Sequence, residues 1–93
     1  MNKKRKRIRM GERQYRVTRK PTTKKVQKEL DGKVNYNNGF IFIHPALKRD
    51  ELLETLIHEG LHASIPSLSE DAVDQAAKEI TRLVRKFGFD QTE

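Results

Sequence analysis

The stretch from Leu52 to Ala63 reads LLETLIHEGLHA and contains an HExxH pattern, from His58 to His62. Apolar residues recur here every three or four positions, which predicts a helix with one side packed on a core. Two histidines four positions apart lie on the same side of a helix, one turn from each other. The spacing therefore places both imidazoles where a single zinc ion could bind them.

Glu59 follows the first histidine and lies about a quarter-turn away from the histidine side of the predicted helix. A carboxylate there can reach a water molecule on the metal without binding the metal itself, which is the position of a general base. The histidine flank also carries Glu51 and Thr55, which suits a cleft better than a core. The alternative is that both histidines face solvent on an amphipathic helix that binds no metal.

The chain has 93 residues, enough for one small domain with a thin core, so a bound metal would also add stability. The absence of cysteine excludes disulfides and thiolate metal sites. No apolar run reaches transmembrane length, and no signal-peptide apolar segment follows the basic start. We therefore expect a cytoplasmic protein without a membrane partner, while the oligomeric state stays open.

Positive charge is concentrated at the start of the chain. Residues 1–28 contain 13 Lys or Arg and one acid, a net charge of +12, whereas residues 29–93 contain seven Lys or Arg and 12 acids, a net charge of −5. We treat residues 1–9 as a basic tail and residues 10–93 as a single domain. The tail could bind the phosphate backbone of a nucleic acid, through Lys3, Lys4, Arg5, Lys6, Arg7 and Arg9. The alternative is a solvated tail, since no aromatic residue lies among these charges to stack on bases.

Two β-hairpins are expected before the motif helix. Residues 7–18 alternate weakly between apolar and polar positions on either side of a Gly-containing turn. In residues 33–44, the turn sequence NNG precedes FIFI at 40–43, the stretch of highest β propensity. Because that stretch is apolar at every position, both of its faces should be covered. Residues 24–31 fit either one helical turn or a loop.

A second helix is expected from Glu70 to Phe87, where apolar residues again recur at helical spacing. Ser67 or Ser69 would cap its start, and Asp50 is the expected cap of the motif helix. The sequence thus predicts an α+β fold. A small antiparallel β-sheet of two hairpins would pack on the motif helix, and the C-terminal helix would follow it.

Catalytic zinc is usually held by three protein ligands, so a third is needed besides the histidines. Glu70 is the first candidate, because it opens the second helix on the inward stripe and a short link lets the chain turn back. Asp74, one turn later, could accept a hydrogen bond from the second nitrogen of a ligand histidine. The alternative for Glu70 is that its negative charge only interacts favourably with the helix dipole, and Asp71 would then be the third ligand. The alternative for Asp74 is that it is simply exposed to solvent.

With these residues identified, the chain resembles zincin metallopeptidases. The series His58-Glu59-x-x-His62 and Glu70-x-x-x-Asp74 is similar to the gluzincin pattern, in which the glutamate is the third zinc ligand and the aspartate supports the site. Residues 33–88 are similar to small metallopeptidases encoded by phages and prophages. The resemblance implies a minimal zincin with one zinc ion per chain that acts in the host cell.

The chain also departs from the gluzincin pattern. The interval from His62 to Glu70 is much shorter than in large gluzincins, and the basic tail is not part of the pattern. No residue securely matches their oxyanion-stabilising Tyr or His; Tyr36 and His44 are the candidates for a transition-state donor. The alternative for His44 is simple exposure.

The sequence therefore predicts a zinc-dependent metallopeptidase that hydrolyses a peptide or protein substrate, with Glu59 as the general base. Strand 40–43 would align the substrate backbone if it forms the edge of the sheet. One alternative is a basic nucleic-acid-binding protein of phage type in which the zinc is structural and has four protein ligands. Another is a former enzyme that holds no metal.

Overall fold

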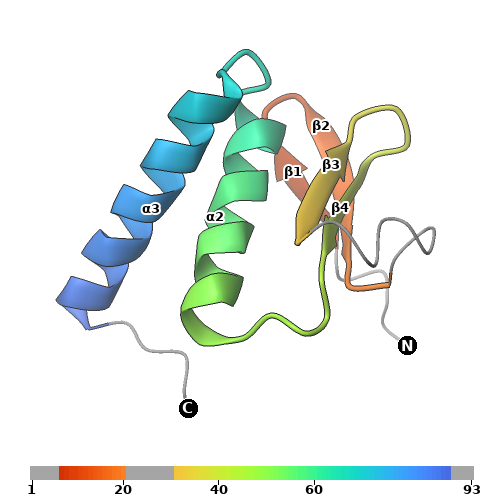
Figure 1. Ribbon diagram of the computed structural model, residues 1–93. Helices are drawn as coiled ribbons and strands as arrows, with labels where there is room; N and C mark the ends of the chain where they lie inside the picture. Colours follow the sequence, from red (N-terminus) through yellow and green to blue (C-terminus); the bar gives the residue numbers. More distant parts are fainter. Residues whose placement is uncertain (1–6, 21–30, 89–93) are drawn as a thin grey trace.

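A computed structural model describes residues 7–20 and 31–88 and shows an α+β arrangement (Figure 1). Within these residues, four strands form one sheet and two helices lie on one side of it. The strands are β1 (Arg7–Met10), β2 (Arg13–Thr18), β3 (Gly32–Asn35) and β4 (Phe40–Ile43). The helices are α2 (Arg49–Ser64) and α3 (Glu70–Phe87). The predictions of two hairpins and two helices are confirmed.

The sheet is mixed, so the prediction of an antiparallel sheet is wrong in one respect. Its strand order is β1-β2-β4-β3, and each hairpin is antiparallel, but β2 and β4 run parallel where the hairpins meet. Each hairpin is determined by its local turn sequence. Which strands pair between the two hairpins depends instead on how the apolar side chains are buried. β4 is the most apolar strand, with Ile41, Phe42 and Ile43 buried, and it therefore takes an inner position.

The inner position of β4 contradicts the expectation that strand 40–43 could be the sheet edge that aligns a substrate. In the described part of the chain, β1 and β3 are the edge strands. β3 pairs with β4 on one side only, and its other side runs along α2. Any peptide that added a strand beside the helix would therefore pair with β3.

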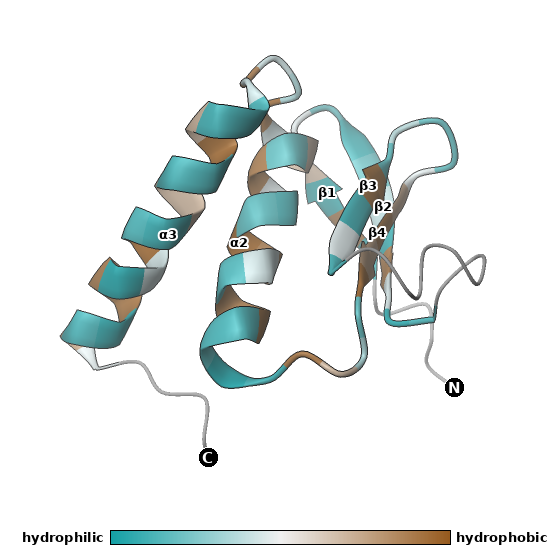
Figure 2. Cartoon of the chain, in the orientation of Figure 1, coloured by the Kyte–Doolittle hydropathy of each residue, from teal (hydrophilic) through white to brown (hydrophobic). Residues whose placement is uncertain are grey.

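Helix α2 is the middle layer of the molecule, between the sheet and α3 (Figure 1). The core between α2 and the sheet consists of one buried cluster: Tyr15, Ile41, Ile43, Leu47 and Ala63. On α3, Val73 and Ala77 are fully buried, while hydrophilic residues cover the outer side of this helix (Figure 2). Because α2 contacts both neighbours, side chains on its remaining flank are held in a fixed orientation.

The two helices begin differently. Ser69 caps α3, and its Oγ accepts a hydrogen bond from the backbone N–H of Ala72 at 3.1 Å. Asp50 does not cap α2, contrary to the prediction, because α2 begins two residues earlier, with Lys48 at the cap position. The Asp50 carboxylate instead forms an ion pair with Arg85 of α3.

β1 begins at Arg7, inside the range 1–9 that was predicted as a basic tail and at the start of the predicted hairpin 7–18. Arg7 and Arg9 are therefore residues of the sheet, while residues 1–6 of the predicted tail and residues 24–30 of the ambiguous segment 24–31 lie outside the described residues. Neither α2 nor α3 combines the length and hydrophobicity that crossing a membrane requires.

Candidate metal centre

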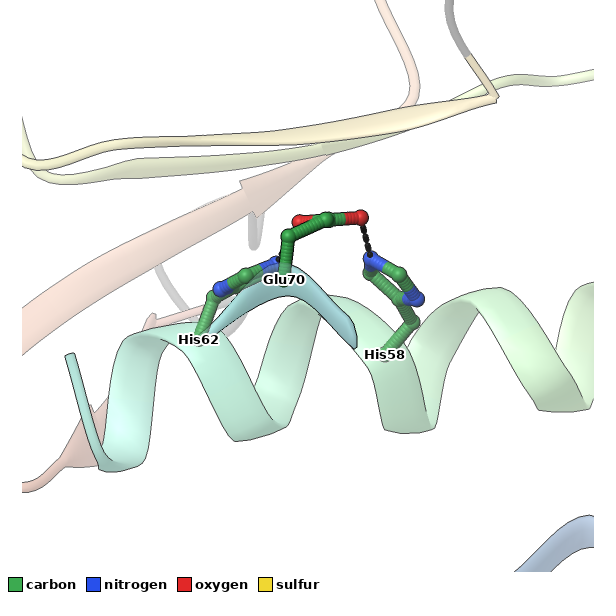
Figure 3. Close-up of side chains that lie close together, drawn as sticks. All are labelled: His58, His62 and Glu70. Carbon is green, nitrogen blue, oxygen red and sulfur yellow. Dashed lines mark hydrogen bonds and ion pairs between the residues drawn. The ribbon is translucent and has the colours of Figure 1, made fainter. Parts of the chain in front are cut away.

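His58 and His62 lie one turn apart on the same flank of α2 (Figure 3). Their ring centroids are 5.0 Å apart, and both side chains are mostly buried, at 18% exposure each. The i, i+4 spacing produces this arrangement directly, because residues four apart on a helix are neighbours. Packing of α2 against the sheet and α3 then limits how far the two imidazoles can move.

Glu70 reaches the two histidines from the start of α3 (Figure 3). Its Oε1 lies 2.8 Å from Nε2 of His62, and its Oε2 lies 3.2 Å from Nε2 of His58. A short link makes this approach possible: the Ile65 N–H donates to the Leu61 carbonyl, and a further turn leads to the Ser69 cap. The first residue of α3 is therefore brought back over the last turns of α2.

The chemistry and spacing of these three side chains fit a zinc ion. His58, His62 and Glu70 each offer one ligand atom, and the three atoms all lie within 4.8 Å of one another. Ligand atoms about 2.1 Å from a tetrahedral zinc ion would be roughly 3.4 Å apart, so only small side-chain shifts are needed. Two imidazoles and one carboxylate are a donor set typical of catalytic zinc sites.

Glu59 is buried at 7% exposure, although it is charged in its usual state. Burial raises its pKa to about 7, and the nearby negative charge of Glu70 contributes in the same direction. A group that titrates near neutral pH can both accept and release a proton, as a general base must. A cation held between the histidines would lower this pKa and favour the carboxylate form.

Gly32 is a site residue that no local sequence pattern indicates. A Cβ atom there would lie 2.9 Å from Cγ of Glu59 and 2.9 Å from Cγ2 of Thr55. At Gly60, which lies between the two histidines on α2, a Cβ atom would meet only Met10 among the described residues, at an ordinary 3.6 Å. The close contact that covers Glu59 is therefore made by β3 at Gly32.

Asp74 lies beside the site, but its carboxylate contacts a lysine. Its Oδ1 is 3.9 Å from Nδ1 of His58, too far for a hydrogen bond, while its Oδ2 accepts one from Lys78 at 2.8 Å. The hydrogen bond from Lys78 lowers the pKa of Asp74, so this carboxylate keeps its negative charge near the histidine. Asp71, the alternative ligand, is exposed and does not belong to the group of ligand atoms found among the described residues.

Of the two candidate transition-state donors, the structure brings only Tyr36 to the site. Its hydroxyl donates a hydrogen bond to the His62 carbonyl at 3.0 Å, and its side chain lines the pocket beside the histidines. Burial raises the pKa of Tyr36, so the hydroxyl stays protonated at neutral pH. His44 lies beyond the end of β4, where its Nδ1 accepts from the Ala46 N–H, and it is not among the lining residues.

An open pocket of about 420 Å³ lies between α2 and the edge strand β3. Its lining combines the candidate ligands with the general-base candidate and the strand: Gly32, Lys33, Val34, Tyr36, His58, Glu59, His62 and Glu70. The candidate metal ligands are therefore accessible from solvent. The arrangement can admit a small group or an extended chain along β3.

Comparisons with protein-family models, with curated proteins and with solved structures find no match to this chain. The resemblance to zincins thus rests on the motif residues and their spacing.

Proposed function

We propose that this protein is a zinc-dependent hydrolase of peptide bonds, with His58, His62 and Glu70 as the metal ligands. The observation that carries this proposal is that the candidate metal ligands and a candidate general base lie in one pocket. Three atoms that could bind a metal ion lie within 4.8 Å of one another, and the buried Glu59 lines the same pocket. A structural zinc site normally has four protein ligands, whereas three candidate ligands come together among the described residues.

A zinc ion held by His58, His62 and Glu70 would supply a Lewis acid able to polarise the scissile carbonyl and to acidify a water molecule. Glu59 accepts a proton from the attacking water as its oxygen forms a bond to the carbonyl carbon. Glu59 then passes this proton to the leaving nitrogen as the carbon–nitrogen bond breaks. The Tyr36 hydroxyl, which now donates to the His62 carbonyl, can donate to the substrate oxygen that becomes negative.

The surroundings of the pocket favour an extended peptide as substrate. β3 is an edge strand that lines the pocket, so a peptide could form backbone hydrogen bonds with it. A second, more apolar pocket of about 400 Å³ adjoins the first at Tyr36 and includes Met10, Tyr15 and Ala63 in its lining. It could receive an apolar substrate side chain.

The test is hydrolysis of a mixture of fluorogenic peptides by zinc-loaded wild type and by Glu59→Gln. Glutamine keeps the shape of the side chain but cannot accept the proton, so we expect hydrolysis to fall by about 100-fold or more. Zinc content should stay unchanged, because Glu59 is not a ligand. Glu51→Gln, an exposed substitution on the same helix, is the control and should keep full activity. Equal hydrolysis by wild type and Glu59→Gln would refute the proposal.

A further inference from the structure

The sheet has a second face, turned away from α2. Tyr15, Ile41 and Ile43 point toward the helix, since they belong to the core cluster that also contains Ala63 of α2. Side chains alternate across a strand, so their sequence neighbours lie on the opposite face. Strand register then assigns nine positions to this outer face: Arg7, Arg9, Gln14, Arg16, Thr18, Lys33, Asn35, Phe40 and Phe42.

Positive charge without any acid distinguishes this outer face. Of its nine positions, four are basic and none is acidic, and all four basic residues are exposed. Arg7 lies directly opposite Arg16 in the register of β1 and β2. Like charges in directly opposed positions destabilise a strand pair, and a bound polyanion would remove that repulsion.

The arginines also surround a small polar pocket of about 170 Å³. Arg7, Gln14 and Arg16 of the outer face line it, and its remaining lining residues are Arg13, Tyr15, Asn38 and Gly39. The guanidinium group of Arg16 lies 5.5 Å from the centre of the Phe40 ring, which orients it on this face. Oriented guanidinium groups favour bidentate binding of phosphate oxygens.

We propose that this outer face binds the phosphate backbone of a nucleic acid, with Arg7, Arg9 and Arg16 as the principal contacts. Arg7 and Arg9 are two residues apart on one face of β1, hence about 7 Å apart, a spacing suited to successive phosphates. Four more basic residues immediately precede Arg7 in the sequence and extend the run of charge.

Nucleic acid fits this face better than a membrane does. A membrane-binding surface normally inserts apolar side chains beside its charges. Here the two apolar residues of the face are covered, since Phe42 is 4% exposed and Phe40 is partly buried with Arg16 over its ring. Because the proposed contacts are made to the phosphate backbone, binding should depend little on base sequence and should weaken steeply with salt.

The test uses the full chain and a fluorescein-labelled DNA duplex of about 25 base pairs, titrated at several salt concentrations. The triple variant Arg7→Gln, Arg9→Gln, Arg16→Gln should bind roughly tenfold more weakly or worse. Loss of three phosphate contacts should also reduce the slope of log K against log salt by about two to three. Removing the opposed pair of arginines relieves repulsion, so the fold should persist, as circular dichroism can verify.

A control triple with the same change in charge is Lys48→Gln, Arg82→Gln, Lys86→Gln, at exposed positions on or beside the helices. It should reduce affinity less than about threefold, because only the general attraction of the net charge is lost. Replacing the three face arginines by lysine should keep the salt slope, because the charges remain. Equal losses in the two Gln triples would overturn the proposal. So would vesicles containing anionic lipid that bind the wild type as tightly as the duplex does.

Discussion

Glu59 is the residue whose surroundings differ most from those of an ordinary helical glutamate. It is covered by β3 at Gly32 and faces the candidate metal ligands. Burial of an ionisable carboxyl without a partner costs stability, which proteins accept mainly at functional sites. A cation bound beside Glu59 would offset this cost. The residue therefore connects the stability of the metal-free protein to its proposed chemistry.

The raised pKa of Glu59 predicts how the stability of the metal-free protein depends on pH. Its pKa is 4.5 when unperturbed and about 7 in the folded chain. Below pH 4.5 Glu59 is protonated in both the folded and the unfolded state, so it does not affect stability. Between pH 4.5 and about 7, Glu59 ionises in the unfolded state but stays protonated in the folded state, which lowers the free energy of the unfolded state. The folded state should thus lose stability across this interval, on the order of 3 kcal/mol.

Unfolding of wild type and Glu59→Gln by urea, with a chelator present, tests this dependence. The variant should gain stability over wild type between about pH 5 and about pH 8, because glutamine does not ionise. Groups that do not interact with Glu59 contribute equally to both proteins, so the difference reports Glu59 together with its interaction with Glu70. A difference in the free energy of unfolding that stays constant with pH would contradict the assignment.

Tyr36 provides a second test at the level of one residue. Tyr36→Phe removes the hydroxyl but keeps the ring that lines both pockets. Loss of one donor to a developing negative charge typically costs about 100-fold or more in kcat. We expect kcat for peptide hydrolysis to fall on that scale with unchanged zinc content. An unchanged kcat would remove Tyr36 from the mechanism.

Contact between α2 and β3 determines how Glu59 is held, and two glycines allow a matched comparison. Gly32→Ala would force Glu59 or Thr55 to move, so we expect a loss of roughly 1–3 kcal/mol and reduced hydrolysis. Gly60→Ala meets only an ordinary contact and removes a glycine from a helix, so we expect a gain of about 0.5–1 kcal/mol. Thermal unfolding measures both. A lower free energy of unfolding in Gly32→Ala and a higher one in Gly60→Ala would support the packing described. A stabilising effect of Gly32→Ala would contradict it.

Most of the elements could be predicted from sequence because local patterns determine them. The NNG turn, the two amphipathic stretches and a serine before Glu70 are signals that act within a few residues. The proximity of Glu70 to the histidines could also be anticipated, since a link of a few residues leaves the chain little freedom to place it elsewhere.

Contacts between distant segments could not be predicted in this way. Nothing local specifies that β2 pairs in parallel with β4, because that choice depends on how the whole apolar surface is covered. The same holds for Gly32, whose role depends on an α2 side chain 27 positions later. Asp50 was misassigned because its partner, Arg85, comes from the other helix.

For the molecule as a whole, the proposed functions lie on different sides of the sheet. The candidate metal ligands are on α2 and α3, while the arginine-rich face is turned away from α2. Substitutions on one side should therefore leave the other intact. This separation allows DNA binding and hydrolysis to be measured independently in the same set of variants.

Hydrolysis at this pocket requires above all that α2 and α3 together hold a single zinc ion. The direct measurement is the zinc content of purified protein, by elemental analysis, for wild type, Glu70→Ala and Asp71→Ala. The two variants remove neighbouring acids from the same helical turn, but only Glu70 contacts the histidines. We predict about one zinc ion per chain in wild type and Asp71→Ala, and a strongly reduced content in Glu70→Ala. Full zinc content in Glu70→Ala, or none in wild type, would contradict the account.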